Sequence, residues 1–430
     1  MIQDTRISTV SNHPVADGDY VLYWMQAAQR ASCNHALEYA IAAANALRQP
    51  VVVCFGLTER YPEANLRHYA FMLEGLGDVA QQLRRRRIQL VVRQGEPAQV
   101  AIEMAGRASL VVADVGYFPF QKAWRQQVAR GVPRRVVQVE SEVVVPVEVV
   151  SDKEEWAART IRPRIHRHLR EYLVPLAETK PLRSSLDLHL PGLDISDPRA
   201  VLAHLRLDRT VAPSAQFRGG TGEARRRFAE FLDQRLPRYH ELRSEPGLNW
   251  VSHMSPYLHF GQISPLELAL AASERPGPGA EAFLEELVVR RELSMNFVHY
   301  NGAYHNFACL PDWAQRTLRQ HQRDRRARTY TLEELEAGAT EDPYWNAAQM
   351  EMVLTGKMHN YMRMYWGKKV IEWTEDPQEA YQHLVYLNNK YELDGRDPNS
   401  YAGIAWCFGK HDRPWAERPI FGTVRYMSAT

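Results

Sequence analysis

The sequence contains few cysteines and lacks the short motifs that usually identify a metal or nucleotide site. Its four cysteines, Cys33, Cys54, Cys309 and Cys407, form no CxxC pair. This spacing argues against zinc and disulfides and for a reducing compartment. Neither GxGxxG nor GxxxxGK[ST] occurs, so the usual signatures of dinucleotide and triphosphate cradles are missing. No apolar run approaches ~20 residues and the N-terminus does not resemble a signal peptide, so we expect a cytoplasmic protein without membrane contact.

The composition is that of a globular protein with more than one domain. The chain has 430 residues, of which 45% are hydrophobic and 24% charged, and its net charge of +2 does not by itself predict a nucleic-acid partner. Three runs are nevertheless strongly basic: Arg84 to Arg87, RTIRPRIHRHLR ending at Arg170, and RTLRQHQRDRRAR ending at Arg328. Such runs are usually solvated helix faces, but several together also fit a groove that follows phosphates.

Short apolar runs alternate with helical patterns through the first part of the chain. The apolar runs begin near Asp19, Val51, Ile88, Ser109 and Arg135, and helix-period spacing fills the intervals. This alternation predicts a doubly wound, Rossmann-like parallel α/β sheet covered by helices on both faces. Any ligand of such a sheet is expected at the carboxyl ends of its strands.

The middle of the chain is rich in prolines and glycines, and the last part reads as helices only. The Gly219–Gly220 pair and several prolines indicate a long linker that wraps the surface. The sequence predicts an α/β domain over residues 1–174, a linker over 175–215 and an all-helical domain over 216–430.

Several polar residues lie on helix faces that otherwise look buried. Asp376 and Pro377 are typical of a helix start, and Asn388 then falls on the apolar face of that helix. Arg363 cannot lose its charge, so its burial requires a carboxylate, for which Asp394 is the candidate. A loop-capping asparagine and an ordinary interhelical ion pair explain these residues equally well. A polar-edged aromatic ligand is the alternative that we favour.

Further candidates are aromatic or acidic. Trp366 and Trp373 lie two turns apart on one helix face, and Trp345 of the preceding helix could pack beside them. Such a cluster is typical of core packing but also suits a path for electrons. Glu286 either forms an i,i+4 ion pair with Arg290 or is a carboxylate held in a cavity to bind a substrate carbonyl or imide.

Four blocks of sequence carry a more specific resemblance. WVSHMSPYLHFGQIS, ELVVRRE, TGKMHNYMRMYWGKK and YELDGRDPNSYAGIAW occur in this order. Together they resemble the photolyase/cryptochrome family, and specifically its class II branch of cyclobutane pyrimidine dimer photolyases. The resemblance covers nearly the whole chain. It implies an antenna domain, a linker and a helical FAD domain. It also implies a carbon–carbon lyase that uses light and reduced FAD to split pyrimidine dimers in UV-damaged double-stranded DNA.

The resemblance also implies residue roles. The expected FAD-binding residues are Ser252, Met254, Ser255, Arg290, Asn360, Arg363, Asn388 and Asp394. The expected catalytic residues are Glu286, Met364 and Trp406 at the dimer, Asn388 at the flavin, and Trp366, Trp345 and Trp373 on the photoreduction route. The expected DNA-binding residues are Arg413, Arg425 and Trp406. No metal is expected, and a second antenna chromophore, a deazaflavin or a folate, is left open for the N-terminal domain.

The sequence departs from the family pattern at Val289, where class I relatives place a lesion-stacking tryptophan, so Trp406 is expected to do more of that stacking. The segment 299–310 matches no familiar family pattern. A cryptochrome-like photoreceptor without repair activity is the alternative function. The chain ends at Thr430 soon after the last motif, which favours the enzyme. Six-four specificity would place histidines at some lesion-pocket positions, and the class II motifs argue against it. The missing glycine fingerprint and the helical half disfavour a plain nucleotide-binding module. We expect a monomer.

Overall fold

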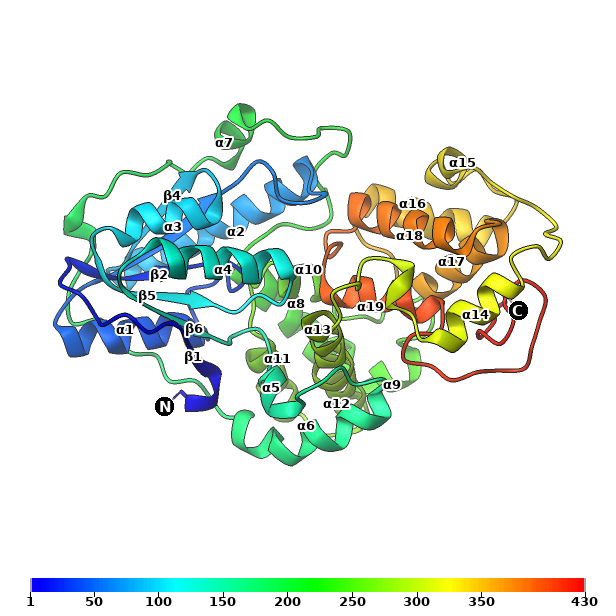
Figure 1. Ribbon diagram of the computed structural model, residues 1–430, viewed down its shortest axis with the longest axis horizontal. Helices are drawn as coiled ribbons and strands as arrows, with labels where there is room; N and C mark the ends of the chain where they lie inside the picture. The colour runs from blue at the N-terminus through cyan, green and yellow to red at the C-terminus, as the bar shows by residue number, and fades with distance from the viewer. Residues whose placement is uncertain (1, 429–430) are drawn as a thin grey trace.

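A computed structural model describes residues 2–428 of the chain. Within them, six strands form one sheet in the order β1-β6-β5-β2-β3-β4 (Figure 1). The strands from β2 to β6 are parallel, and β1 lies antiparallel to β6 at the edge. Their bounds are β1 Ile7–Ser11, β2 Tyr20–Trp24, β3 Val51–Leu57, β4 Gln89–Gln94, β5 Ala108–Asp114 and β6 Arg135–Val139.

Helices cover both faces of the sheet, because successive side chains of each buried strand point to opposite sides. Val21 and Tyr23 pack in the core beneath one pair of helices, while Leu22 and Trp24 pack beneath the other pair. The first pair is α1 His35–Leu47 and α2 Leu66–Arg85, and the second is α3 Pro97–Ala105 and α4 Pro119–Gly131. The doubly wound arrangement predicted from the sequence is confirmed.

The chain leaves the sheet after β6 and enters the helical part through α5 Val147–Val150 and α6 Ala158–Tyr172. Side chains of α6, including Ile161 and Ile165, share a core with helices that come later in the chain. The proline-rich stretch that follows contains α7 Pro198–His204 and returns over the sheet, where Arg86 donates to the carbonyl of Thr179 at 3.0 Å. The division at residues 174 and 215 stays a prediction, and the packing of α6 favours an earlier first boundary.

The remaining chain is helical and lies beside and below the sheet in the view of Figure 1. No helix within residues 2–428 combines the length and the apolar character needed to cross a membrane. The helices are α8 Thr221–Gln234, α9 Tyr239–Leu242, α10 Ser255–His259, α11 Pro265–Ser273, α12 Pro278–Leu284, α13 Arg291–Tyr300, α14 Asp312–Gln320, α15 Leu332–Glu336, α16 Pro343–Thr355, α17 Asn360–Trp373, α18 Pro377–Tyr391 and α19 Pro398–Cys407, with short 3-10 turns at Leu186–Leu188, Leu236–Arg238 and Phe307–Cys309.

Two local features position functional side chains. A π-helical turn, η4 Glu285–Arg290, joins α12 to α13 and re-aims the side chains that it carries. Three helices of the site begin with an Asp-Pro pair, as α7 also does at Asp197, and in each pair the aspartate accepts a hydrogen bond from the first turn and proline occupies the first helical position. These N-caps are Asp342 of α16, Asp376 of α18 and Asp397 of α19.

Candidate functional site

A cavity of about 540 Å³ opens among the helices. Its size lies within the usual range for small-molecule and cofactor sites. The cavity gathers residues that are up to 188 positions apart in the sequence, from Tyr239 to Met427. The predicted site residues that line it are Ser252, Met254, Ser255, Glu286, Arg290, Asn360, Arg363, Met364, Trp366, Asn388, Asp394, Trp406 and Arg425.

A cluster of charged side chains lies on one wall of this cavity. Arg363 Nη2 donates to Asp394 Oδ1 at 2.7 Å, so the predicted ion pair is present, and it also donates to Glu392 Oε2 at 2.9 Å. Lys357 Nζ donates to Ser255 Oγ at 2.9 Å and lies 3.9 Å from Asp394 Oδ2. The second oxygen of Glu392 accepts from the backbone N–H of Met358 at 3.0 Å. Two cations and two carboxyl groups therefore face the cavity together.

The pKa values of the two carboxyl groups shift in opposite directions. Burial tends to raise both of them. It raises the pKa of Glu392 above its usual range, although Arg363 opposes the shift. Burial alone would also raise the pKa of Asp394, but the charges of Arg363 and Lys357 outweigh it and hold that pKa below its usual range. Burial also lowers the pKa of Lys357, which Asp394 and Glu392 oppose, so Arg363 and Asp394 are the two groups of this wall whose charged forms their neighbours favour.

The neutral polar residues of the cavity come from three elements. Asn388 of α18 is only 4% exposed and donates to Asn389 Oδ1 at 3.0 Å. Asn360 stands at the start of α17. Ser252 and Ser255 flank the turn into α10, in which the N–H of Met254 donates to Ser252 Oγ at 3.4 Å. The cavity thus offers amides and hydroxyls around its charged wall.

The π-helical turn supplies another side of the cavity. Glu286 forms an ion pair with Arg243. The alternative prediction of an i,i+4 pair between Glu286 and Arg290 is wrong, because Glu285 makes that contact at 3.4 Å. The guanidinium of Arg290 lies over the ring of Trp406, 5.2 Å from its centre. Glu286 of the π-helical turn and Trp406 of α19 therefore both line the larger cavity.

The three predicted tryptophans form a continuous series from the cavity inward. Trp366 lines the cavity and stacks on Trp345, with ring centres 6.4 Å apart and planes at 10°. Trp345 meets Trp373 edge-on at 5.4 Å, and Tyr330 lies 5.0 Å beyond Trp373. Trp366 Nε1 donates to Gln349 Oε1 at 2.9 Å, a neutral acceptor that cannot take up the proton.

The two predicted DNA-binding arginines lie close to each other near the C-terminus. The guanidinium groups of Arg413 and Arg425 lie 5.2 Å and 5.1 Å from the ring centre of Trp415. Trp415 is 42% exposed, which is unusual for a side chain of its size. Arg425 also lines the cavity, so this exposed group of one indole and two cations adjoins its mouth.

Comparison with known proteins identifies the family. Residues 21–182 match the family model described as DNA photolyase. The chain is 54% identical over 429 residues to the deoxyribodipyrimidine photo-lyase of Methanothermobacter thermautotrophicus, covering 100% of this chain and 95% of that protein. It is also 39% identical over 437 residues to the enzyme of the same name from Potorous tridactylus, covering 99% and 81%. The chain belongs to the DNA photolyase family.

Solved structures agree with this photolyase fold. A class III photolyase from Agrobacterium tumefaciens superimposes with a TM-score of 0.72 at 17% identity, covering 94% of this chain and 82% of that one. A cryptochrome from Synechocystis superimposes with the same TM-score of 0.72 at 15% identity, covering 93% and 84%. At these identities the structures support the fold alone.

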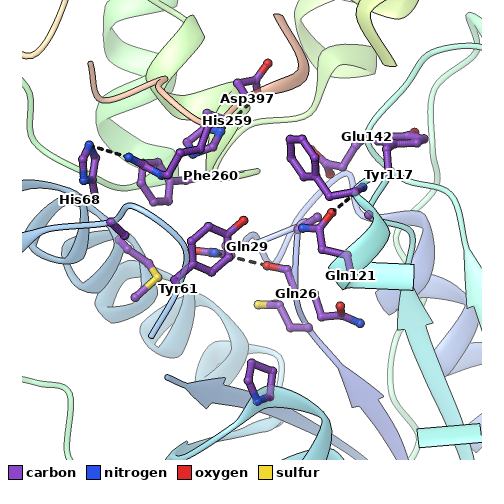
Figure 2. Close-up of a pocket in the computed structure, with 18 of the residues that line it drawn as sticks. Gln26, Gln29, Tyr61, His68, Tyr117, Gln121, Glu142, His259, Phe260 and Asp397 are labelled. Carbon is purple, nitrogen blue, oxygen red and sulfur yellow. Dashed lines mark hydrogen bonds and ion pairs between the residues drawn. The ribbon is translucent and has the colours of Figure 1, made fainter. Parts of the chain in front are cut away.

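This member of the photolyase family has a second, smaller cavity of about 120 Å³ between the sheet and the helices. Figure 2 shows Gln26, Gln29 and Tyr61, which follow the carboxyl ends of β2 and β3, opposite His259 and Asp397 of the helical part. Within residues 2–428, both polar atoms of the buried Gln26 amide lack a hydrogen-bond partner. An unsatisfied buried amide is costly, so this cavity suits a polar ligand or water.

Two residues of the charged wall in this photolyase-family protein, Glu392 and Lys357, were not predicted from the sequence. An acidic residue two positions before Asp394 and a lysine three positions before Asn360 were the only available signals. Arg243 and Gln349 were missed as well. Their roles depend on contacts with Glu286, 43 positions away, and Trp366, 17 positions away, which no local pattern reveals.

Proposed function

We propose that this chain repairs cyclobutane pyrimidine dimers in UV-damaged DNA by light-driven electron transfer, as a class II photolyase acting as a monomer. The proposal rests mainly on one observation: a cavity of cofactor size is lined by a charged wall, a carboxylate, an aromatic wall and the first of three adjoining indoles. Reduced FAD, excited by light, supplies the electron that the reaction requires.

The residues of the larger cavity fit FAD. Arg363 Nε is buried without a hydrogen-bond partner among residues 2–428, so a further acceptor from a ligand is accommodated there. In this proposal Arg363, held by Asp394 and Glu392, and Asn388 line the flavin ring. The turn at Ser252 and Ser255, with Asn360 and Arg290, accommodates the phosphates and sugars.

The dimer then binds against the remaining wall. Photolyases are among the enzymes that flip their target bases out of the duplex, and flipping is generally put at a few kcal/mol. Stacking on one aromatic side chain contributes on the order of 1–3 kcal/mol per base, so Trp406 offsets much of that cost. In this proposal the carboxylate of Glu286 leaves its ion pair with Arg243 and accepts a hydrogen bond from the dimer. Met364, which lines the same cavity, contacts the dimer. Arg413 and Arg425 hold the surrounding DNA.

We propose the smaller cavity as the site of a second chromophore. Gln26 and Gln29 offer amide groups to a planar, polar-edged ring at the carboxyl ends of the strands. A volume of about 120 Å³ holds only about four water molecules, so a ring system enters only when lining side chains move.

The proposal is tested by the absorption spectrum of the purified protein followed by a light-dependent repair assay. We expect stoichiometric FAD and light-dependent loss of thymine dimers from irradiated DNA. FAD binding and flavin photochemistry without loss of dimers would instead identify a cryptochrome-like photoreceptor.

Glu286→Ala separates repair from binding. Because Glu286 contacts the dimer rather than the DNA backbone in this proposal, we expect repair yield per absorbed photon to fall about tenfold or more, equivalent to about 1.4 kcal/mol. The dissociation constant for damaged DNA should change less than threefold. A variant that loses only affinity contradicts the role given to Glu286.

A further inference from the structure

The basic run that ends at Arg170, like the other two, lines neither cavity. It forms α6, which borders the molecule at the lower edge of Figure 1. The helix buries Ile161 and Ile165 in the core that it shares with later helices. Helical periodicity places Arg159, Arg167 and Arg170 on the opposite face, where all three are exposed. The result is a basic stripe along one side of a surface helix.

The arginines of this stripe are free to bind a partner. Arg162 pairs with Glu285 at 2.6 Å and Arg164 with Glu155 at 3.0 Å, so their charges are already compensated. By contrast, in the chain from residue 2 to residue 428 neither Arg167 nor Arg170 forms an ion pair or a hydrogen bond. Like charges three positions apart on a helix destabilise it by a few tenths of a kcal/mol. A bound anion would relieve the repulsion between Arg167 and Arg170, and this relief would add to the free energy of binding.

The start of α6 lies next to the proposed dimer-binding wall. Just before the helix, Trp156 is 47% exposed, and the guanidinium of Arg159 lies 5.0 Å from its ring centre. The carbonyl of Trp156 accepts from His411 Nδ1 at 2.9 Å, and the His411 ring lies 5.9 Å from that of Trp406. A partner that reaches Trp406 therefore passes close to the first turn of α6.

The other two basic runs also mix arginines that have a partner within the protein with arginines that are exposed, but they do not adjoin Trp406. Arg86, in the run at the end of α2, pairs with Glu38 at 2.8 Å. In the run that begins within α14, Arg326 donates to the carbonyl of Thr374 at 3.0 Å, and Arg328 pairs with Glu341 at 3.1 Å. The stripe on α6 combines free guanidinium groups with a position beside the larger cavity.

We propose that Arg159, Arg167 and Arg170 of α6 bind the phosphate backbone of the duplex on one side of the lesion. This inference rests on the proposed DNA-repair function and extends it to a surface outside the lesion cavity. Eleven residues separate the first and last of these arginines, a helix length of ~16 Å. At 3.4 Å per base-pair step, this distance corresponds to about five steps. Contacts of this kind read no base sequence.

The test is a salt titration of binding to a duplex of about 30 base pairs that carries one central thymine dimer. The variants are Arg167→Gln/Arg170→Gln and, as a matched control with the same change in charge, Arg84→Gln/Arg85→Gln. Each lost phosphate contact lowers the slope of log K against log [salt] by ~0.9. We expect the α6 variant to lose ~1.8 from the slope and the control to keep the wild-type slope.

This difference in slope has a direct consequence for affinity. Between about 50 and about 200 mM salt, the wild-type advantage over the α6 variant should shrink ~12-fold. Trimming the duplex to about three base pairs on one side of the dimer should abolish the advantage, whereas trimming the other side should leave it. Equal slopes for the α6 variant and the control overturn the inference.

A dimer in a short dinucleotide separates this inference from the proposed function. It carries no flanking phosphates, so the α6 variant should repair it at the wild-type rate under light. Wild-type protein that splits no dimers overturns the proposed function. Wild-type protein that repairs dimers while the α6 variant keeps the full slope overturns only the role of α6.

Discussion

At the scale of single residues, the row of indoles offers the clearest functional test. Trp366 touches the cavity, whereas Trp345 and Trp373 do not line it. The N–H of Trp345 donates to the carbonyl of Trp366 at 3.0 Å, and that of Trp366 donates to Gln349. Neither acceptor is a base, so an oxidised indole keeps its proton and can take an electron from the next ring. We therefore propose Trp366 as the first indole to donate an electron if a flavin occupies the cavity.

We expect Trp366→Phe to abolish photoreduction, because a phenyl ring is much harder to oxidise than an indole while its volume keeps the packing. Steady illumination with an external reductant, followed by the flavin absorption spectrum, measures this effect. Enzyme reduced chemically with dithionite should still repair dimers at close to the wild-type rate.

The matched control is Trp313→Phe, a tryptophan outside both cavities. It should leave photoreduction intact. Full photoreduction in Trp366→Phe contradicts the route, and loss of repair in the chemically reduced variant indicates a role in binding the flavin or the dimer instead.

Which single residues could be predicted depended on their chemistry. Arg363 and Asp394 were predictable as a pair, because a buried guanidinium needs a carboxylate and one stood nearby in the sequence. Glu392 was not, because an exposed and a buried glutamate look alike in the sequence. Of the two alternatives for Glu286, the pairing with Arg290 was wrong, since the π-helical turn at Glu285–Arg290 shifts the i,i+4 spacing on which it rested.

At the scale of elements, the starts of the helices that carry the site are set by side chains. Asp376 Oδ1 accepts from the N–H of Gln378 at 2.8 Å and caps α18, the helix of Asn388. Pro377 follows at the first helical position, where no N–H is required. The N-cap role of Asp376 and the position of Pro377 were both predicted from the sequence, because a helix cap involves only residues one to three positions apart.

Replacing the cap should destabilise the protein by a predictable amount. We expect Asp376→Ala to lower the free energy of unfolding by ~1 kcal/mol, because the N–H of Gln378 loses its acceptor. Asp376→Asn keeps an acceptor and should cost only a few tenths of a kcal/mol. Urea unfolding followed by circular dichroism compares the two. Equal losses for both variants contradict a capping role and indicate that the charge of Asp376 matters instead.

Periodicity also explains which elements were predicted and which were not. The parallel strands β2 to β6 appeared as apolar runs because they are buried on both faces. Strand β1 was missed because Ile7–Ser11 is short, polar and largely exposed at the sheet edge. The basic run that forms the stripe of α6 could be recognised in the sequence. Its exposure and its position near Trp406 could not, because they depend on packing between distant segments.

At the scale of the whole molecule, buried ionisable side chains join the sheet to the helices. Glu292 of α13 accepts from the backbone N–H of Val144 at 2.5 Å and of Val145 at 3.3 Å, in the segment that leaves β6. Arg6, near the N-terminus, donates to the carbonyl of the same Val144 at 2.5 Å. The partners are more than 130 positions apart, so no sequence pattern could reveal this junction.

The protonation of Glu292 links stability to pH. Burial raises its pKa to about 8, although the N–H groups of Val144 and Val145 and the charges of Arg291 and Arg6 oppose the shift. The unfolded chain releases this proton near pH ~4.3, whereas the folded protein retains it until about pH 8. The folded state therefore binds more protons in this window, and the contribution of Glu292 to stability falls as the pH rises through it.

We therefore expect Glu292→Gln to change the slope of stability against pH rather than only its level. The variant cannot titrate at this position, so between about pH 5 and about pH 7 its unfolding free energy should decline less steeply, by up to ~1.4 kcal/mol per pH unit. Urea unfolding at several pH values measures both curves, and the histidines and other carboxyl groups contribute equally to each. Parallel curves would show that Glu292 is ionised in the folded protein, with its carboxylate held by the two N–H groups at the junction of sheet and helices.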